Sequence, residues 1–83
     1  MERRIDELER AIARILAEVK RDPSLAERIT PGTNLTEEVG LDSLELTDFV
    51  LRLEEALGLT VDYERFDLQH LRSLKSFAEF LSE

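Results

Sequence analysis

The sequence lacks cysteine entirely and contains a single histidine, His70. Without cysteine the chain forms no disulfide bond and no thiolate metal site. One histidine alone cannot supply a histidine cluster for a metal ion. The absence of cysteine also suits a reducing compartment. The start of the chain, Met1 to Arg4, leads into amphipathic sequence with no apolar stretch of signal-peptide or membrane-span length. We therefore expect a soluble, cytoplasmic protein.

Positive charge is also scarce: 11 basic residues stand against 19 acidic ones, for a net charge of −8. Binding to nucleic acid needs a basic face, so nucleic acid is excluded as an expected partner. Anionic membrane surfaces are disfavoured for the same reason. An acidic domain is instead steered toward basic patches on other proteins.

The common catalytic motifs are missing as well. Ser43 lies in the sequence LDSLE, not in the Gly-x-Ser-x-Gly of a serine hydrolase. There is no calcium-binding loop and no glycine-rich phosphate loop. A chain of 83 residues buries only roughly 60–65% of its unfolded surface, which leaves little room for a deep cleft. We expect one domain, residues 1–83, that is not an enzyme.

Apolar residues recur at helical spacing in three parts of the chain. The first stripe predicts a helix over residues 2–20, which Asp22-Pro23 ends. A long loop follows, with a short turn of helix near residues 25–28. The second stripe, at Leu46, Phe49, Val50, Leu53 and Leu57, predicts a helix over residues 43–57.

The ends of this second helix have clear local determinants. Asp42 is a good N-cap, Glu45 three residues later completes a capping box, and Gly58 is a fitting terminator. The alternating residues 57–63 have no partner strand, so we expect an extended connection. A short helix or turn around residues 66–71 follows, where a surface or capping role is expected for His70.

Ser73 then caps the last helix. The predicted fold is therefore all-α: a small four-helix bundle of three longer helices and one short helix, with a long loop between the first and second.

Ser43 stands at the first turn of the second helix, where backbone N–H groups are unpaired and the helix dipole favours negative charge. A phosphodiester on its hydroxyl would be stabilised there. These local properties permit such a site but do not require one, because most serines at helix starts have only a structural role.

Residues 35–46, LTEEVGLDSLEL, resemble the signature of acyl carrier and peptidyl carrier proteins, which bind phosphopantetheine. The resemblance extends over most of the chain, since Ile29-Thr30-Pro31, the segment 49–55 and the segment 66–74 match other parts of stand-alone carriers. It implies that Ser43 receives phosphopantetheine from coenzyme A through a separate magnesium-dependent transferase. The thiol of that arm would then hold an acyl or aminoacyl group as a thioester. Asp42 is expected to help to position the transferase and its metal.

The resemblance also implies a partner surface on the second helix. Its members are expected to be Leu44, Glu45, Asp48, Leu51, Arg52 and Glu55. For each charged residue taken singly, the alternative is that it belongs to an ordinary solvated surface. Leu51 is more informative, because it is an apolar residue that lies off the core stripe. Arg52 departs from a purely acidic face and points to a dedicated set of partners.

The implied partners are the phosphopantetheinyl transferase, a loading enzyme and downstream biosynthetic enzymes, and we expect a monomer. The pathway and the cargo (fatty acyl, polyketide, aminoacyl or a modified extender unit) stay open. Leu46, Phe49, Leu53 and Phe77 could line a cavity for a cargo chain, but we favour a plain core. The alternative function is an unmodified helical interaction module with a carrier-like fold.

Overall fold

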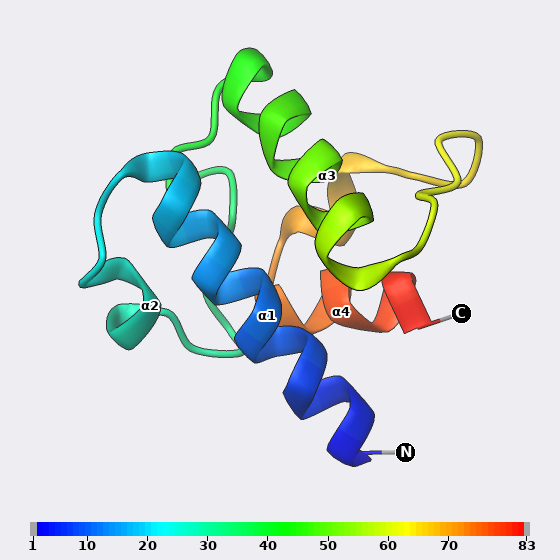
Figure 1. The fold of residues 1–83 in the computed structure, drawn as a ribbon, viewed down its shortest axis with the longest axis horizontal. Helices are drawn as coiled ribbons and strands as arrows, with labels where there is room; N and C mark the ends of the chain where they lie inside the picture. Colours follow the sequence, from blue (N-terminus) through cyan, green and yellow to red (C-terminus); the bar gives the residue numbers. More distant parts are fainter. Residues whose placement is uncertain (1, 83) are drawn as a thin grey trace.

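The computed structural model describes residues 2–82, and Met1 and Glu83 lie outside the described residues, as do the side chains of residues 2–4. The order of elements is α1 (Glu2–Lys20), α2 (Leu25–Arg28), α3 (Ser43–Leu57), the 3-10 helix η1 (Leu68–Leu71) and α4 (Leu74–Ser82) (Figure 1). No strand is present between residues 2 and 82. The all-α prediction is confirmed, with the long loop between α1 and α3 in its expected place. Two short helical turns are present, because both α2 and η1 form.

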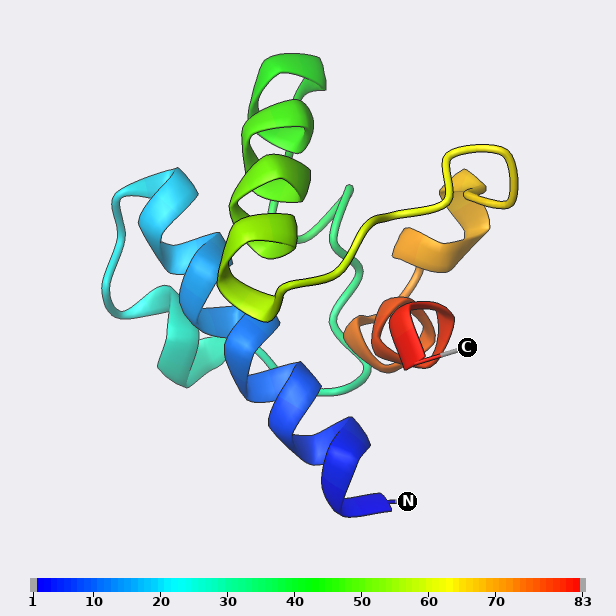
Figure 2. The ribbon, with the colours of Figure 1, turned by 45° about the vertical axis from the view of Figure 1, so that its right-hand side comes forward.

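Helix α1 is the central element, since it contacts α2, α3 and α4. Its apolar stripe explains this position: Ile12 and Leu16 are fully buried, and Ile15 nearly so. The helix ends at Lys20 because Arg21 takes a left-handed φ of 54° and Pro23 follows. Figure 2 shows α3 crossing α1 on one side while α4 is viewed nearly end-on.

The core lies where the inner faces of α1, α3 and α4 meet. Phe49 of α3 and Phe77 of α4 are fully buried with ring centroids 5.6 Å apart. Leu53 is also fully buried, and Leu46 packs against the cluster at its edge. The four residues considered as a cavity lining are therefore core residues, as favoured from the sequence.

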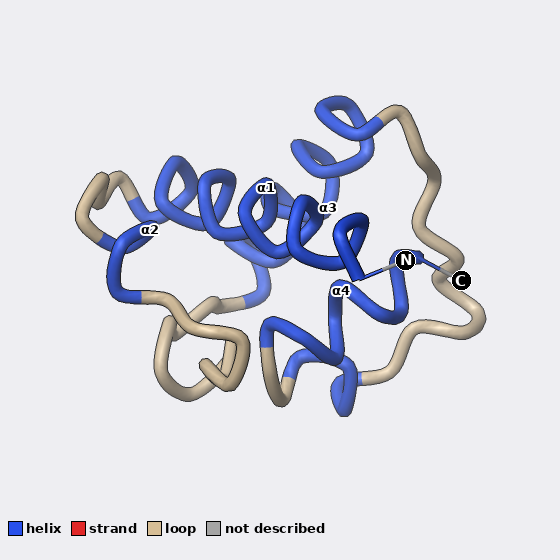
Figure 3. Tube along the Cα trace, turned by 90° about the horizontal axis from the view of Figure 1, so that it is seen from below, coloured by secondary structure: helices blue, strands red, loops and turns tan. Residues whose placement is uncertain are grey.

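Figure 3 shows the path of the long loop between α2 and α3 as a tan tube. Backbone hydrogen bonds join this loop to η1 and to the start of α4. The Leu74 N–H donates to the Thr33 carbonyl at 3.0 Å, and the Lys75 N–H donates to the Pro31 carbonyl at 2.9 Å. The Leu35 N–H donates to the Leu71 carbonyl at 2.9 Å. The first N–H groups of a helix have no partner inside it, so the loop carbonyls satisfy donors that α4 leaves open. The loop is thereby fixed on the bundle.

After α3, residues 59–62 form no helix or turn, in agreement with the predicted extended connection, and a turn at residues 63–65 and η1 then lead to α4. Gly58 ends α3 with a left-handed φ of 64°. At η1 the His70 Nδ1 atom accepts from the Asp67 N–H at 3.0 Å, and the His70 ring stacks on Phe80 with centroids 4.3 Å apart. The capping role expected for His70 is confirmed. Ser73 also acts as predicted, since its hydroxyl accepts from the Ser76 N–H at 3.0 Å.

A membrane crossing needs a long apolar helix, and no helix within residues 2–82 meets that requirement.

Candidate functional site

Ser43 is the first residue of α3, and its side chain is exposed. Its hydroxyl makes no hydrogen bond to any of the described residues, while its carbonyl accepts from the Thr47 hydroxyl at 3.0 Å. The hydroxyl is therefore accessible and not engaged by a neighbour. An enzyme that approached this end of α3 would reach it without displacing a protein contact.

Asp42 and Glu45 form the predicted capping box around Ser43. The Glu45 N–H donates to Asp42 Oδ1 at 2.8 Å, and the Asp42 N–H donates to Glu45 Oε1 at 3.2 Å. Asp42 itself is extended, with ψ of −179°, and its carbonyl accepts the Leu46 N–H at 2.8 Å. Its Oδ2 atom has no partner among the described residues. One carboxylate oxygen thus holds the helix start, and the other stays open.

The first amides of α3 remain unpaired. Within residues 2–82, no acceptor is found for the N–H groups of Ser43 and Leu44. The next two N–H groups are paired, since Glu45 donates to the Asp42 side chain and Leu46 donates to the Asp42 carbonyl. Free N–H groups at a helix start attract an anion. A phosphate ester on the Ser43 hydroxyl would lie at this end of the helix. The residues present therefore fit a phosphate-linked prosthetic group.

Lys20, the last residue of α1, reaches the segment on both sides of Ser43. Its Nζ atom donates to the Gly40 carbonyl at 3.1 Å and to Glu45 Oε1 and Oε2 at 2.9 and 3.1 Å. Gly40 has a φ of 77°, which favours glycine at this position. Sequence reasoning missed Lys20, because a lysine at a helix C-terminus is ordinary and its partners lie 20 and 25 residues away.

Two leucines of α3 face solvent beside the site. Leu44 has 83% of its surface exposed and Leu51 has 53% exposed. They are seven positions apart and so lie on one side of the helix. Their neighbours Phe49, Val50 and Leu53 are buried. The structure thus places Leu44 and Leu51 off the core stripe and on the surface.

The charged residues expected on this face are largely engaged within the protein. Arg52 Nε donates to Asp48 Oδ1 at 3.0 Å, and Arg52 Nη1 lies 3.6 Å from Glu18 Oε1 of α1. The Glu45 carboxylate turns toward Lys20. Glu55 is exposed and has no ion-pair partner among the described residues. Glu18 was not anticipated, since no local pattern links it to Arg52.

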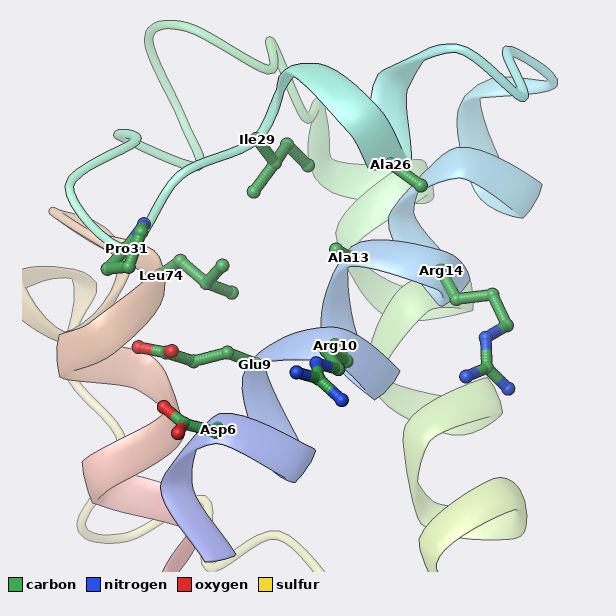
Figure 4. Close-up of a pocket in the computed structure, with 9 residues that line it drawn as sticks. All are labelled: Asp6, Glu9, Arg10, Ala13, Arg14, Ala26, Ile29, Pro31 and Leu74. Carbon is green, nitrogen blue, oxygen red and sulfur yellow. The ribbon is translucent and has the colours of Figure 1, made fainter. Parts of the chain in front are cut away.

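A surface hollow of about 420 Å³ lies away from Ser43, between α1, α2 and the start of α4. Ala13, Ile29 and Leu74 are among its lining residues, and Figure 4 shows Asp6 and Glu9 pointing toward α4. Burial raises the pKa of Glu9, and Asp6 and Glu79 add repulsion that Lys75 partly offsets. Ser43 does not contribute to the lining of this hollow.

Comparison with known proteins shows the family of the chain as a whole. A family model described as "Phosphopantetheine attachment site" matches residues 6–81. An acyl carrier protein of Nitratidesulfovibrio vulgaris strain DP4 is 32% identical over 57 residues, which cover 69% of this chain and 72% of that protein. An acyl carrier protein of Syntrophobacter fumaroxidans is 33% identical over 57 residues, covering 69% and 68%. No solved structure matches significantly.

The family match spans nearly the whole of the described bundle, including the capping box, Ser43 and the core of all three longer helices. Members of this family are carriers rather than catalysts, and they bear phosphopantetheine as a prosthetic group. The chain belongs to the family of phosphopantetheine-binding carrier proteins.

Proposed function

We propose that this protein is an acyl carrier protein, and that it holds acyl or aminoacyl groups as thioesters on a phosphopantetheine arm attached to the Ser43 hydroxyl. The observation that supports Ser43 as the attachment residue is its position. Its exposed hydroxyl makes no hydrogen bond to the described residues and lies at a helix start with two free amides. The arm comes from coenzyme A and supplies the reactive thiol. The chain itself catalyses no reaction.

Asp42 is proposed to help a transferase and its magnesium ion to reach Ser43. Its free Oδ2 atom is the group available for that role, since Oδ1 is used by the helix cap. A carboxylate oxygen is a ligand that magnesium prefers. The Asp42 side chain is exposed, so a partner enzyme has access to it.

The partner surface is proposed to centre on Leu44 and Leu51, with the charged residues Glu45, Asp48, Arg52 and Glu55 around them. The support is that two large apolar side chains face water on one side of α3, next to Ser43. Exposed apolar groups near a reactive site favour a protein contact over a solvated face. The partners would be the transferase, a loading enzyme and downstream biosynthetic enzymes.

Residues 1–83 are proposed to work as one monomeric carrier domain in the cytoplasm. One cluster of buried residues joins α1, α3 and α4, which supports a single unit. The absence of cysteine suits a reducing compartment. The proposed cargo is an acyl or aminoacyl group.

The test is the intact mass of the protein after incubation with coenzyme A, magnesium and a broad-specificity phosphopantetheinyl transferase. We expect the wild-type protein to gain the mass of one phosphopantetheine and Ser43→Ala to gain none. Ser24→Ala, which alters another exposed serine next to a helix, is the matched control and should be modified normally. A wild-type protein that gains no mass would favour the unmodified interaction module. A gain of mass that survives Ser43→Ala would contradict Ser43 as the attachment residue.

A further inference from the structure

The Lys20 ammonium group ends α1 and lies against the junction that leads into α3. It has three N–H donors and meets three acceptors: the Gly40 carbonyl and both oxygens of Glu45. The side chains of Lys20 and Glu45 are only 25% and 29% exposed. Partial shielding from water makes this contact stronger than a fully exposed ion pair. Lys20 thus forms a specific contact, not a loose surface pair.

The acceptors lie on both sides of Ser43 in the sequence. Gly40 belongs to the loop, whereas Glu45 belongs to the first turn of α3. Glu45 Oε1 also accepts from the Asp42 N–H, so the same carboxylate joins Lys20 to the capping box. Lys20 therefore connects α1, the loop and α3 at one point. It adds a polar contact between elements at a turn that is otherwise held by the capping box and by the packing of Val39 and Leu41 against the core.

The chemistry of lysine suits this contact. A compact ammonium can point its donors in three directions, toward a carbonyl and a carboxylate at once. The planar guanidinium of arginine presents its donors in one fork and fits a single carboxylate better. The left-handed backbone of Gly40 turns the loop at the residue whose carbonyl meets Lys20.

We propose that Lys20 is a positioning residue for the Ser43 site: its ammonium group fixes the loop-to-helix junction in the geometry in which Ser43 is modified. This inference rests on the proposed attachment of phosphopantetheine to Ser43. When the junction is already formed, a larger fraction of the protein is in the conformation that the transferase binds, so the apparent affinity is higher.

The test compares Lys20→Met with Arg21→Met. Methionine keeps an unbranched stem and removes the charge in both variants, and the Arg21 side chain has no partner among the described residues. For Lys20→Met we expect the KM of the transferase for this protein to rise about tenfold, with kcat changed less than about twofold, because a smaller fraction of the chain is competent to bind. Arg21→Met should leave both constants near those of the wild type. A KM for Lys20→Met within twofold of the Arg21→Met value would overturn the proposal.

Amide hydrogen exchange gives a second readout that does not depend on modification. The Glu45 and Leu46 N–H groups both donate to Asp42, so their protection reports on the junction. In Lys20→Met their protection should fall about tenfold while the amide of the buried Leu53 keeps its protection, which identifies local opening. Equal loss of protection at all three amides would mean that the whole protein is destabilised. No loss of protection would mean that Lys20 does not stabilise the junction. Either result overturns the proposal.

A double variant tests whether Lys20 acts through Glu45. Glu45→Gln retains an oxygen that can accept from the Asp42 N–H but removes the charge that faces Lys20. If the two residues act as a unit, the double variant should raise KM by less than the product of the effects of Lys20→Met and Glu45→Gln measured singly. Effects that multiply would show independent roles and contradict the proposal. If the wild-type protein takes up no phosphopantetheine, the proposed function is wrong. The exchange experiment would still decide whether Lys20 stabilises the junction.

Discussion

Asp42 stabilises the start of α3 through one carboxylate oxygen and leaves the other oxygen open beside Ser43. The capping bond from the Glu45 N–H is 2.8 Å long and well placed. Capping is a local property that asparagine provides as well as aspartate. The charge that a metal or a transferase would use belongs to aspartate alone. The two roles of this residue can therefore be separated by substitution.

We predict that Asp42→Asn keeps the stability of the protein within about 0.5 kcal/mol, whereas Asp42→Ala lowers the free energy of unfolding by about 1 kcal/mol. Both variants should be modified by the transferase more slowly than the wild type, because both lack the carboxylate. Urea denaturation measures the first effect, and the rate of mass gain with coenzyme A measures the second. If Asp42→Asn is modified at the wild-type rate, the proposed role of Asp42 is limited to capping.

The environment of Glu9 leads to a prediction about how the stability of the protein depends on pH. Burial raises its pKa above the ordinary value of 4.5, with added repulsion from Asp6. A raised pKa means that the folded state favours the protonated form. The stability from this preference is fully present below pH 4.5 and is lost as the pH rises through the raised value.

We therefore predict that Glu9→Gln, which resembles the protonated form, is more stable than the wild type at pH 7 by less than about 1 kcal/mol. The advantage should shrink as the pH falls toward the ordinary pKa of glutamate. Thermal unfolding at several pH values between 4 and 7 measures it. Glu7→Gln, at an exposed position on the same helix, is the matched control and should show no such trend. A gain that stays constant with pH would contradict the assigned cause.

At the scale of the element, α3 separates two functions on two faces. Leu53 on the inner face is fully buried, while Leu51 on the outer face is 53% exposed. Burying a leucine contributes to folding, whereas exposing one contributes nothing to it. The exposed leucines of α3 are therefore free to serve recognition.

We predict that Leu51→Ser changes the free energy of unfolding by less than about 0.5 kcal/mol but raises the KM of the transferase or of a loading enzyme severalfold. Leu68→Ser is the matched control, since Leu68 is 67% exposed on η1 rather than on α3. It should leave KM unchanged. Equal effects of the two substitutions would show that the outer face of α3 has no special role in partner binding.

At the scale of the whole molecule, one core joins the helices. The buried cluster includes residues of α1, α3 and α4, and α1 contacts each of the other α-helices. A domain with a single core of this size is expected to unfold in one cooperative step. Stability lost anywhere in the core should therefore be shared by all the helices.

We predict that Ile12→Val, at a fully buried position of α1, lowers the free energy of unfolding by about 0.5–1.5 kcal/mol. The slowest-exchanging amides of α1, α3 and α4 should all lose protection by the same amount. Ile29→Val, at a partly buried loop position, is the control and should cost less. A loss confined to the amides of α1 would refute a single cooperative core.

The sequence by itself determined the helices and their ends. The bounds of α3 follow from Asp42, Glu45 and Gly58, because caps join residues that are at most a few positions apart. The apolar stripe of α1 follows from helical periodicity in the same way. The resemblance around Ser43 also needed no coordinates. Ser43 is exposed beside two free amides, and its role as the attachment residue stays a prediction.

Only the tertiary structure decided which distant groups meet. The contacts of Lys20 with Gly40 and Glu45, and of Arg52 with Glu18, join different elements. Such pairs depend on how the helices cross and on the path of the loop between them, which no local pattern specifies. The exposed Ser43 hydroxyl was thus predictable from neighbouring residues, whereas the support that Lys20 gives to it became visible only when α1 and α3 were placed side by side.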